Sequence, residues 1–152
     1  MIYKEAIEDA VSMHDLPAEW SQELLKEAEL IAQKTKQTKY RKDLTTLPFA
    51  TIDGEDAKDF DDAVGIEKTK SGYKLWVCIA DVSYYVKMGS AIDNEALSRA
   101  TSVYLPDRVI PMLPEKLSNN LCSLVPSEDR LTKTAEMDFN PKGEMVGFKM
   151  YN

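Results

Sequence analysis

The chain has 152 residues and a formal net charge of −7, which suits one domain with a single core or a piece of a larger domain. No apolar run approaches the ~20 residues of a membrane span, and the N-terminal stretch lacks the apolar centre of a signal peptide. We therefore expect a cytoplasmic protein with no membrane association. The acidic charge by itself argues against nucleic-acid binding, which usually needs a basic surface.

The cysteines and the histidine do not form a recognisable catalytic or metal-binding motif. Cys78 and Cys122 lie in apolar segments without a CxxC partner, as is typical of buried, reduced thiols rather than of a disulfide or a zinc site. The single histidine, His14, fits a polar turn and cannot build a Ser-His-Asp triad by itself.

Helical patterns come first along the chain. Residues 1–15 indicate a helical lead-in, and apolar side chains at helical spacing predict a helix within residues 16–37. Pro17 lies near its expected first turn, and lysines at its end would favour the helix dipole. We expect residues 1–46 to form a helical linker.

Strand patterns begin after Thr46. Residues 48–53 and 61–68 are interpreted as two strands around an acidic turn, and residues 71–86 as one long strand. A helix within residues 90–101 has Ser90 as its candidate N-cap.

The last part of the chain combines loops with strands. Residues 102–130 carry four prolines and predict irregular structure with one short helical turn. Residues 131–152 predict two strands around an Asn-Pro-Lys-Gly turn, and the chain stops inside the second, which suggests a fragment. The expected fold class is α+β: a mostly antiparallel sheet or partial barrel with a connecting helix and one or two further helices.

The acidic charge is concentrated in one segment. Residues 53–62, the acidic segment, contain one lysine and six carboxylates, and carry −5 of the net charge. The carboxylates are Asp53, Glu55, Asp56, Asp59, Asp61 and Asp62. Apolar sequences flank the segment on both sides. Because two like charges ~4 Å apart repel by about 4 kcal/mol at an effective dielectric of 20, either these side chains spread into water or they share a cation.

Spacing decides which carboxylates could share a cation. On extended backbone Asp59 and Asp61 point to one side and Asp62 to the other, while Asp53 could join them through the turn at Gly54. An all-oxygen site favours hard cations: Mg²⁺, Mn²⁺ or Ca²⁺. An EF-hand is excluded, because a loop starting at Asp59 lacks its required acid, glycine and glutamate.

The four aspartates form the pattern D-x(5)-D-x-D-D, which resembles the catalytic RNB domain of the ribonuclease II and ribonuclease R exoribonucleases. "TIDGEDAKDFDDAV", "LWVCIADVSYYV", "TSVYLPDRVIPMLPEKLSNNLCSL" and "HDLPAEW" are similar to the ribonuclease R branch of this family. The similarity runs from about residue 14 to the end of the chain. It implies that residues 47–152 are the N-terminal part of an RNB domain.

The resemblance implies a function and a set of site residues. The family hydrolyses RNA processively from the 3′ end and releases nucleoside 5′-monophosphates. Asp53, Asp59, Asp61 and Asp62 would be the catalytic, metal-binding residues, with Mg²⁺ as the cofactor and Mn²⁺ as a possible substitute. Tyr104 would stack on a base at the 3′ end of single-stranded RNA, although core packing is an alternative for it. No obligate protein partner is evident.

Other residues in the motifs have more ordinary interpretations. Glu55 and Asp56 fall outside the pattern and are expected to be exposed or to surround the metal ligands. Trp20 and Trp76 are expected in the core. For the arginines Arg99, Arg108 and Arg130, phosphate contact is one option and surface solvation is the commoner one.

Two alternatives to an exoribonuclease stay open: a catalytically silent RNB relative that only binds RNA, and a divalent-metal module that prefers Ca²⁺. The basic RNA-binding domains of the family, its supporting arginine, a glutamate that grips RNA and a second stacking aromatic would lie outside this sequence. We therefore expect the isolated chain to be inactive.

Overall fold

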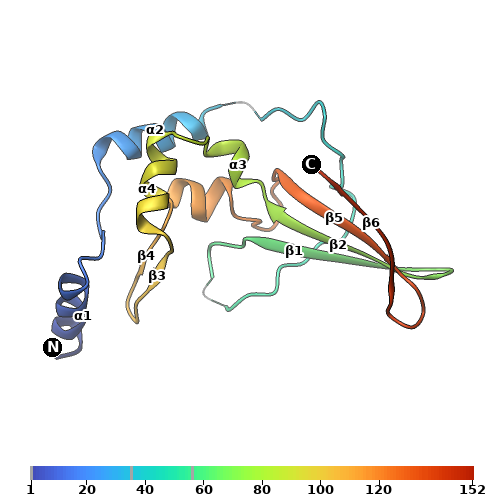
Figure 1. The fold of residues 1–152 in the computed structure, drawn as a ribbon, viewed down its shortest axis with the longest axis horizontal. Helices are drawn as coiled ribbons and strands as arrows, with labels where there is room; N and C mark the ends of the chain where they lie inside the picture. The colour runs from blue at the N-terminus through green and yellow to red at the C-terminus, as the bar shows by residue number, and fades with distance from the viewer. Residues whose placement is uncertain (1, 35, 56) are drawn as a thin grey trace.

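The helices gather at one end of the molecule, and a four-stranded sheet extends away from them (Figure 1). The computed structural model describes residues 2–34, 36–55 and 57–152. Its helices are α1 (Ile2–Met13), α2 (Gln22–Ala32), α3 (Val82–Tyr85), α4 (Ala91–Arg99) and the π-helix η1 (Leu117–Leu121). Its strands are β1 (Asp62–Thr69), β2 (Gly72–Ala80), β3 (Val103–Tyr104), β4 (Val109–Ile110), β5 (Thr132–Phe139) and β6 (Met145–Tyr151).

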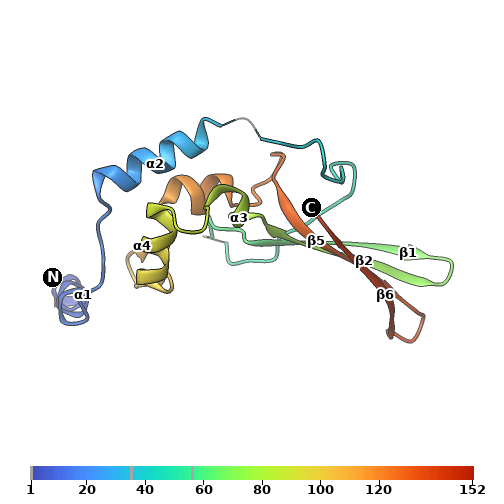
Figure 2. The same cartoon turned by 45° about the horizontal axis from the view of Figure 1, so that its top comes forward.

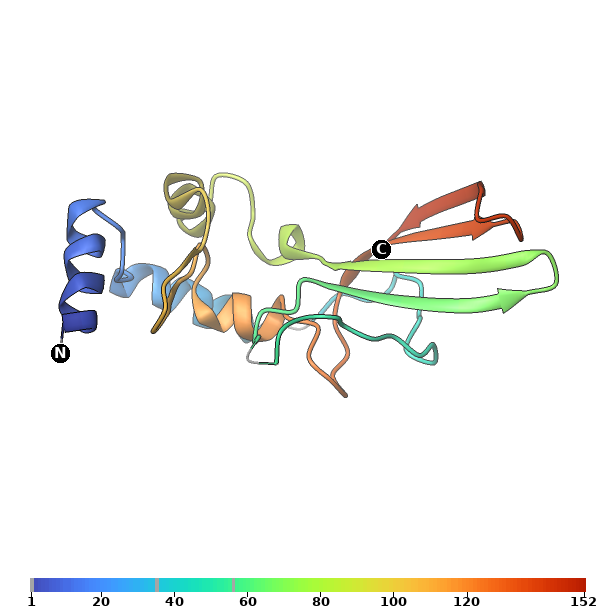
Figure 3. The same cartoon turned by 90° about the horizontal axis from the view of Figure 1, so that it is seen from below.

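The main sheet is antiparallel throughout, in the order β1-β2-β5-β6, and it does not close (Figure 3). A tight turn joins β1 to β2 at Gly72, where φ is +142° and a Cβ atom would lie 2.0 Å from Phe139 O. Only glycine fits this position. The predicted α+β fold class is confirmed, as an open sheet with helices at one end.

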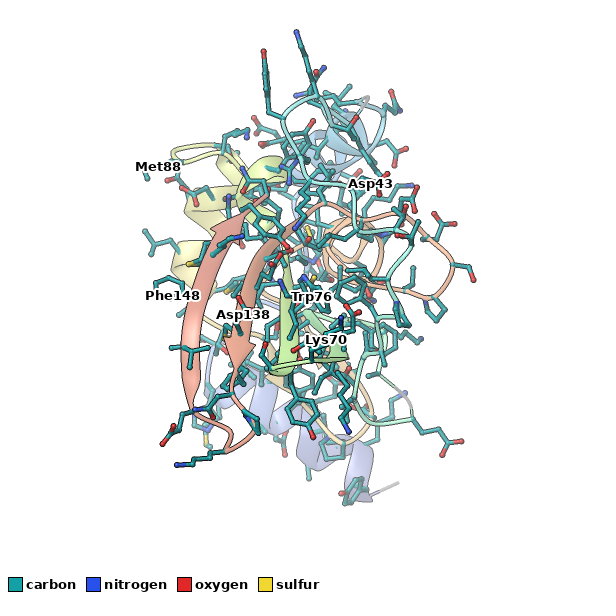
Figure 4. All side chains as sticks on the ribbon, turned by 90° about the vertical axis from the view of Figure 1, so that its right-hand side faces the viewer. Asp43, Lys70, Trp76, Met88, Asp138 and Phe148 are labelled. Carbon is teal, nitrogen blue, oxygen red and sulfur yellow. The ribbon has the colours of Figure 1, made fainter. Side chains whose placement is uncertain are left out.

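The two faces of this sheet differ in how deeply their side chains are buried. Trp76 and Cys78 are buried on one face, beneath the segment that follows α2. The register places an apolar row on the other face, and Figure 4 shows Phe148 on that side, away from Trp76. The residues in this row, the outer apolar face, are Val64, Ile66, Tyr73, Leu75, Val77, Ile79, Ala135, Met137, Phe139, Phe148 and Met150. None of them is fully buried.

The hydrophobic core lies where the helices meet the end of the sheet. Ile92 and Leu117 are completely buried there, and Ala80 and Leu131 bring in the ends of β2 and β5. Figure 2 shows α2, α4 and η1 side by side around this point. The core therefore anchors the sheet at only one end.

A buried carboxylate ties the sheet to the chain that precedes it. Glu136 on β5 accepts hydrogen bonds from Lys42 Nζ (2.8 Å), Lys74 Nζ (2.7 Å) and Tyr151 Oη (2.8 Å). Trp76 Nε1 also donates to Glu136, at 3.3 Å. Together these contacts join β2, β5, β6 and the segment after α2.

Helix α2 begins later than Pro17 suggests. Ser21 is its N-cap and accepts a hydrogen bond from Leu24 N, whereas Arg99 binds the carbonyl oxygens of Pro17 and Glu19. The chain before Ser21 is thus held by Arg99 in a non-helical path. The prediction that lysines lie in the last turn of this helix is also wrong, because α2 ends at Ala32 with no basic residue in its last turn.

Two predicted strands are wrong. Residues 48–53 form only one bridge, Ala50 to Val64, because continuing its register would put Asp53 opposite Asp61, and like charges directly opposite each other are destabilising. The strand expected over residues 71–86 ends at Ala80, and α3 follows.

Short helix α3 carries two tyrosines that the predicted strand over residues 71–86 would have contained. Tyr84 and Tyr85 form an edge-to-face pair with ring centroids 5.0 Å apart. Tyr85 is buried.

Over residues 2–34, 36–55 and 57–152 no helix is both long and apolar enough to cross a membrane.

Candidate active site

Backbone hydrogen bonds hold the chain on both sides of the acidic segment. Both sets of bonds lie where β1 begins and β2 ends. Ala50 N donates to Val64 O and Val64 N donates to Ala50 O, both at 2.9 Å. At the other end, Ala80 N donates to Asp61 O at 2.9 Å, where β1 begins. Between these contacts the chain forms a short loop next to the start of β1 (Figure 3), and Asp53, Asp61 and Asp62 are exposed there.

The second half of the segment is held by the residues that follow η1. Ser123 Oγ donates to Lys58 O (2.7 Å) and accepts from Phe60 N (3.0 Å), while Leu124 N donates to Phe60 O (2.8 Å). Sequence reasoning missed Ser123. Its one signal was a small polar residue within the apolar stretch "NNLCSLV".

Asp61 is affected by burial and by the charges of the other three aspartates. Partial loss of water raises the pKa of Asp61, and the charges of Asp59, Asp62 and Asp53 raise it further. Asp59 is half-buried, and the other three are exposed. The charges of Asp53, Asp59 and Asp62 therefore reach Asp61, including that of Asp62, which the spacing placed on the opposite side of the strand.

The aspartates do not form a complete metal-coordination geometry in this structure. Among the residues that the structure describes, no three His, Cys, Asp or Glu side chains are arranged to hold an ion. The donor set nevertheless fits a hard divalent cation, because it is all oxygen and repels itself without one. The role of these aspartates as metal ligands stays a prediction.

Tyr104, at the end of β3, reaches the acidic segment. Its hydroxyl donates to Asp59 Oδ2 at 2.9 Å, and this bond raises the pKa of Tyr104, with partial burial and the charges of Asp59 and Asp61 adding to the effect. Tyr104 is 67% exposed. The core-packing alternative for Tyr104 is therefore wrong, and the ring is available at the surface beside the carboxylates.

The remaining acidic residues lie outside this arrangement. Glu55 is exposed, as expected. Asp56, for which the same expectation was made, lies outside the described residues.

Arg99 has neither of the roles considered for it. It is buried, lies 3.5 Å from the centroid of the Trp20 ring and binds main-chain oxygens of Pro17, Glu19 and Pro111. It holds the segment before α2 against α4.

The other two arginines also contact protein groups. Arg108 pairs with Glu8 on α1 at 2.7 Å. Arg130 Nε donates to the carbonyl oxygens of Asn120 and Ser123, at 3.0 and 2.9 Å. Of the tryptophans, Trp76 is buried as predicted, whereas Trp20 is half-buried at the edge of the core.

Comparisons with known proteins agree on one family. The model of the RNB domain matches residues 41–152, beginning before the boundary expected at residue 47. Ribonuclease R of Escherichia coli is 50% identical over 149 residues, and ribonuclease R of Thermotoga maritima is 52% identical over 143 residues. The chain spans only 18% and 20% of the length of these two relatives.

A solved structure extends the likeness to three dimensions. Mycoplasma genitalium RNase R, in complex with ribose-methylated single-stranded RNA, matches with a TM-score of 0.89 and 36% identity. The match covers 96% of this chain and 23% of that one.

Proposed function

The chain belongs to the RNB domain family, and from this membership we propose that it supplies the metal-binding part of a processive 3′-to-5′ exoribonuclease. That enzyme hydrolyses RNA to nucleoside 5′-monophosphates. The observation that carries the proposal is the accessible group of Asp53, Asp59, Asp61 and Asp62, whose charges raise the pKa of Asp61. Repulsion of this kind is what a bound divalent cation relieves.

The four aspartates would hold Mg²⁺, with Mn²⁺ as a substitute. Three of them are exposed, so their side chains can turn toward an ion without disturbing the core. When bound, a pair of such ions supplies an activated water and stabilises the leaving oxygen of a phosphodiester. The carboxylates orient this chemistry and balance its charge.

Tyr104 would receive the RNA. Its exposed ring offers a stacking surface, and base–aromatic stacking contributes ~1–3 kcal/mol per base. The hydrogen bond to Asp59 holds the ring beside the carboxylates. A base stacked on Tyr104 would therefore bring its phosphate next to the proposed metal ligands.

The isolated chain should lack activity. It spans about a fifth of the length of ribonuclease R relatives, and its net charge of −7 repels RNA. We expect the 152-residue chain to bind Mg²⁺ weakly and to leave poly(A) intact. Degradation that Asp61→Asn abolishes would contradict this expectation, since a contaminating nuclease would not respond to the substitution.

The function is best tested in a hybrid enzyme, in which this chain replaces the matching segment of Escherichia coli ribonuclease R. The hybrid should degrade 5′-labelled poly(A). Its Asp61→Asn variant should bind RNA as well or better but cleave almost nothing, because one metal-binding charge is lost with little change in volume. Glu55→Gln serves as the control, since it removes an exposed charge outside the motif. Equal loss of binding and cleavage in Asp61→Asn would make Asp61 a folding residue.

A further inference from the structure

Ser123 lies where the hydrophobic core meets the acidic segment. Its side chain is fully buried, and its hydroxyl uses both of its capacities: it donates to Lys58 O and accepts from Phe60 N. With the bond from Leu124 N to Phe60 O, the backbone is held on both sides of Asp59. A turn that carries repelling carboxylates would otherwise relax into water.

Ser123 is itself held firmly. It lies two residues after the end of η1, and the nearby Leu117 and Cys122 are buried in the core. Arg130 Nε binds the carbonyl oxygens of Asn120 and Ser123. The hydroxyl of Ser123 therefore connects the acidic segment to the well-packed region that follows η1.

The residue type at position 123 matters for this connection. A serine hydroxyl can donate one hydrogen bond and accept others within a very small volume. Alanine would fill nearly the same space but leave Lys58 O and Phe60 N without their partner. Groups that orient metal ligands in this indirect way often matter about as much as the ligands themselves.

We propose that Ser123 is a positioning residue for the cation site: it fixes the backbone around Asp59, so that Asp59 and Asp61 stay together with their side chains turned outward. The inference rests on the proposed function, because it assigns the purpose of that geometry to metal binding. It adds a residue that contacts neither metal nor RNA.

The test compares variants of the 152-residue chain in two measurements. Mn²⁺ affinity is measured by water-proton relaxation, and hydrogen exchange of the Phe60 amide by NMR. Ser123→Ala should weaken Mn²⁺ binding about tenfold and accelerate exchange at Phe60 while the protein remains folded. The control is Ser90→Ala, which removes the N-cap of α4 and lowers the melting temperature without touching the acidic segment. It should keep both wild-type values.

The outcomes separate the two proposals. If the wild type binds Mn²⁺ and Ser123→Ala binds it equally well, or if Ser90→Ala weakens it as much, Ser123 has no positioning role. If the wild type binds no Mn²⁺ and Asp61→Asn changes nothing, the proposed function itself fails, whatever the exchange at Phe60 shows. Should Ser123→Ala not fold, Arg130→Gln, which releases the carbonyl of Ser123, is measured in the same way and must weaken Mn²⁺ binding.

Discussion

Tyr104 and Asp59 are 45 positions apart, yet their side chains share one hydrogen bond at the surface. The pairing gives an exposed aromatic ring a fixed orientation, which a free surface tyrosine would not have. It also links the residue proposed to stack on RNA to a proposed metal ligand. Occupation of either would thus affect the other.

This link predicts a measurable change in the titration of Tyr104. Asp59→Asn should lower the pKa of Tyr104 toward its ordinary value, because the carboxylate charge that favours the protonated hydroxyl is removed. The titration can be followed by NMR of the ring in the 152-residue chain. Glu55→Gln, an exposed charge in the same segment, should leave it unchanged. An identical pKa in Asp59→Asn and wild type would mean that the hydrogen bond is absent in solution.

At the scale of elements, Glu136 joins three strands and the segment after α2. Hydrogen bonds from Lys42, Lys74 and Tyr151 hold the pKa of Glu136 well below its usual range, against the opposing effect of burial. A depressed pKa stabilises the folded state above the ordinary pKa of glutamate, near 4.5. This stabilisation is lost as the pH falls from there toward the folded-state value.

Glu136→Gln should therefore lower the free energy of unfolding at pH 7 by about 2 kcal/mol, in line with a lost charge-assisted hydrogen bond. The difference from wild type should shrink as the pH falls below 4.5, because the unfolded wild-type chain then binds a proton at Glu136 that the folded state, with its lowered pKa, still excludes. Urea unfolding at pH 7 and pH 3 measures both values. Glu67→Gln, an exposed change on β1, should have little effect at either pH. A difference that is the same at pH 7 and pH 3 would mean that the charge of Glu136 does not stabilise the fold.

Local pattern predicted some elements and missed others for identifiable reasons. The strands β1, β5 and β6 and the cap at Ser90 follow from alternation, turn residues and side-chain chemistry close in sequence. Helix α3 could not be predicted, because Val82 and Tyr84 favour strands and only tertiary contacts make this segment helical. Arg99 looks like a surface residue in its own helix, since its carbonyl partner at Pro17 is 82 positions away.

In the candidate site, too, some features follow from local sequence and others depend on residues distant in the chain. The spacing of the aspartates predicted that Asp59 and Asp61 lie on one side, and the charges of Asp53, Asp59 and Asp62 all raise the pKa of Asp61. The contacts that set their geometry come from Ser123 and Tyr104, which approach from distant parts of the chain. No pattern around residues 53–62 contains them.

At the scale of the whole molecule, the open sheet leaves its outer apolar face uncovered. Ile66, Phe148 and Met150 are each about two-thirds exposed or more, and β6 is an edge strand that pairs with β5 on one side and, among the described residues, with no strand on the other. Exposed apolar patches and free edges promote association between chains.

The 152-residue chain should therefore self-associate as its concentration rises, with copies meeting at this face. The double substitution Phe148→Lys and Met150→Lys should shift it to monomer, because charges cannot be buried between two sheets at low cost. Sedimentation velocity gives the distribution of species. Met88→Lys, at an equally apolar and exposed residue away from the sheet, should leave the association intact. A wild-type chain that stays monomeric at high concentration would contradict this.

We propose that the four aspartates hold the divalent cations with which the enzyme cleaves RNA, and removal of these cations by chelation tests this role. The hybrid ribonuclease is stripped with EDTA, and 5′-labelled poly(A) is followed over time with each cation added back. Mg²⁺ or Mn²⁺ should restore degradation to single nucleotides, and Ca²⁺ should do so poorly, because its looser coordination does not suit the chemistry. Undiminished cleavage in excess EDTA would contradict the claim.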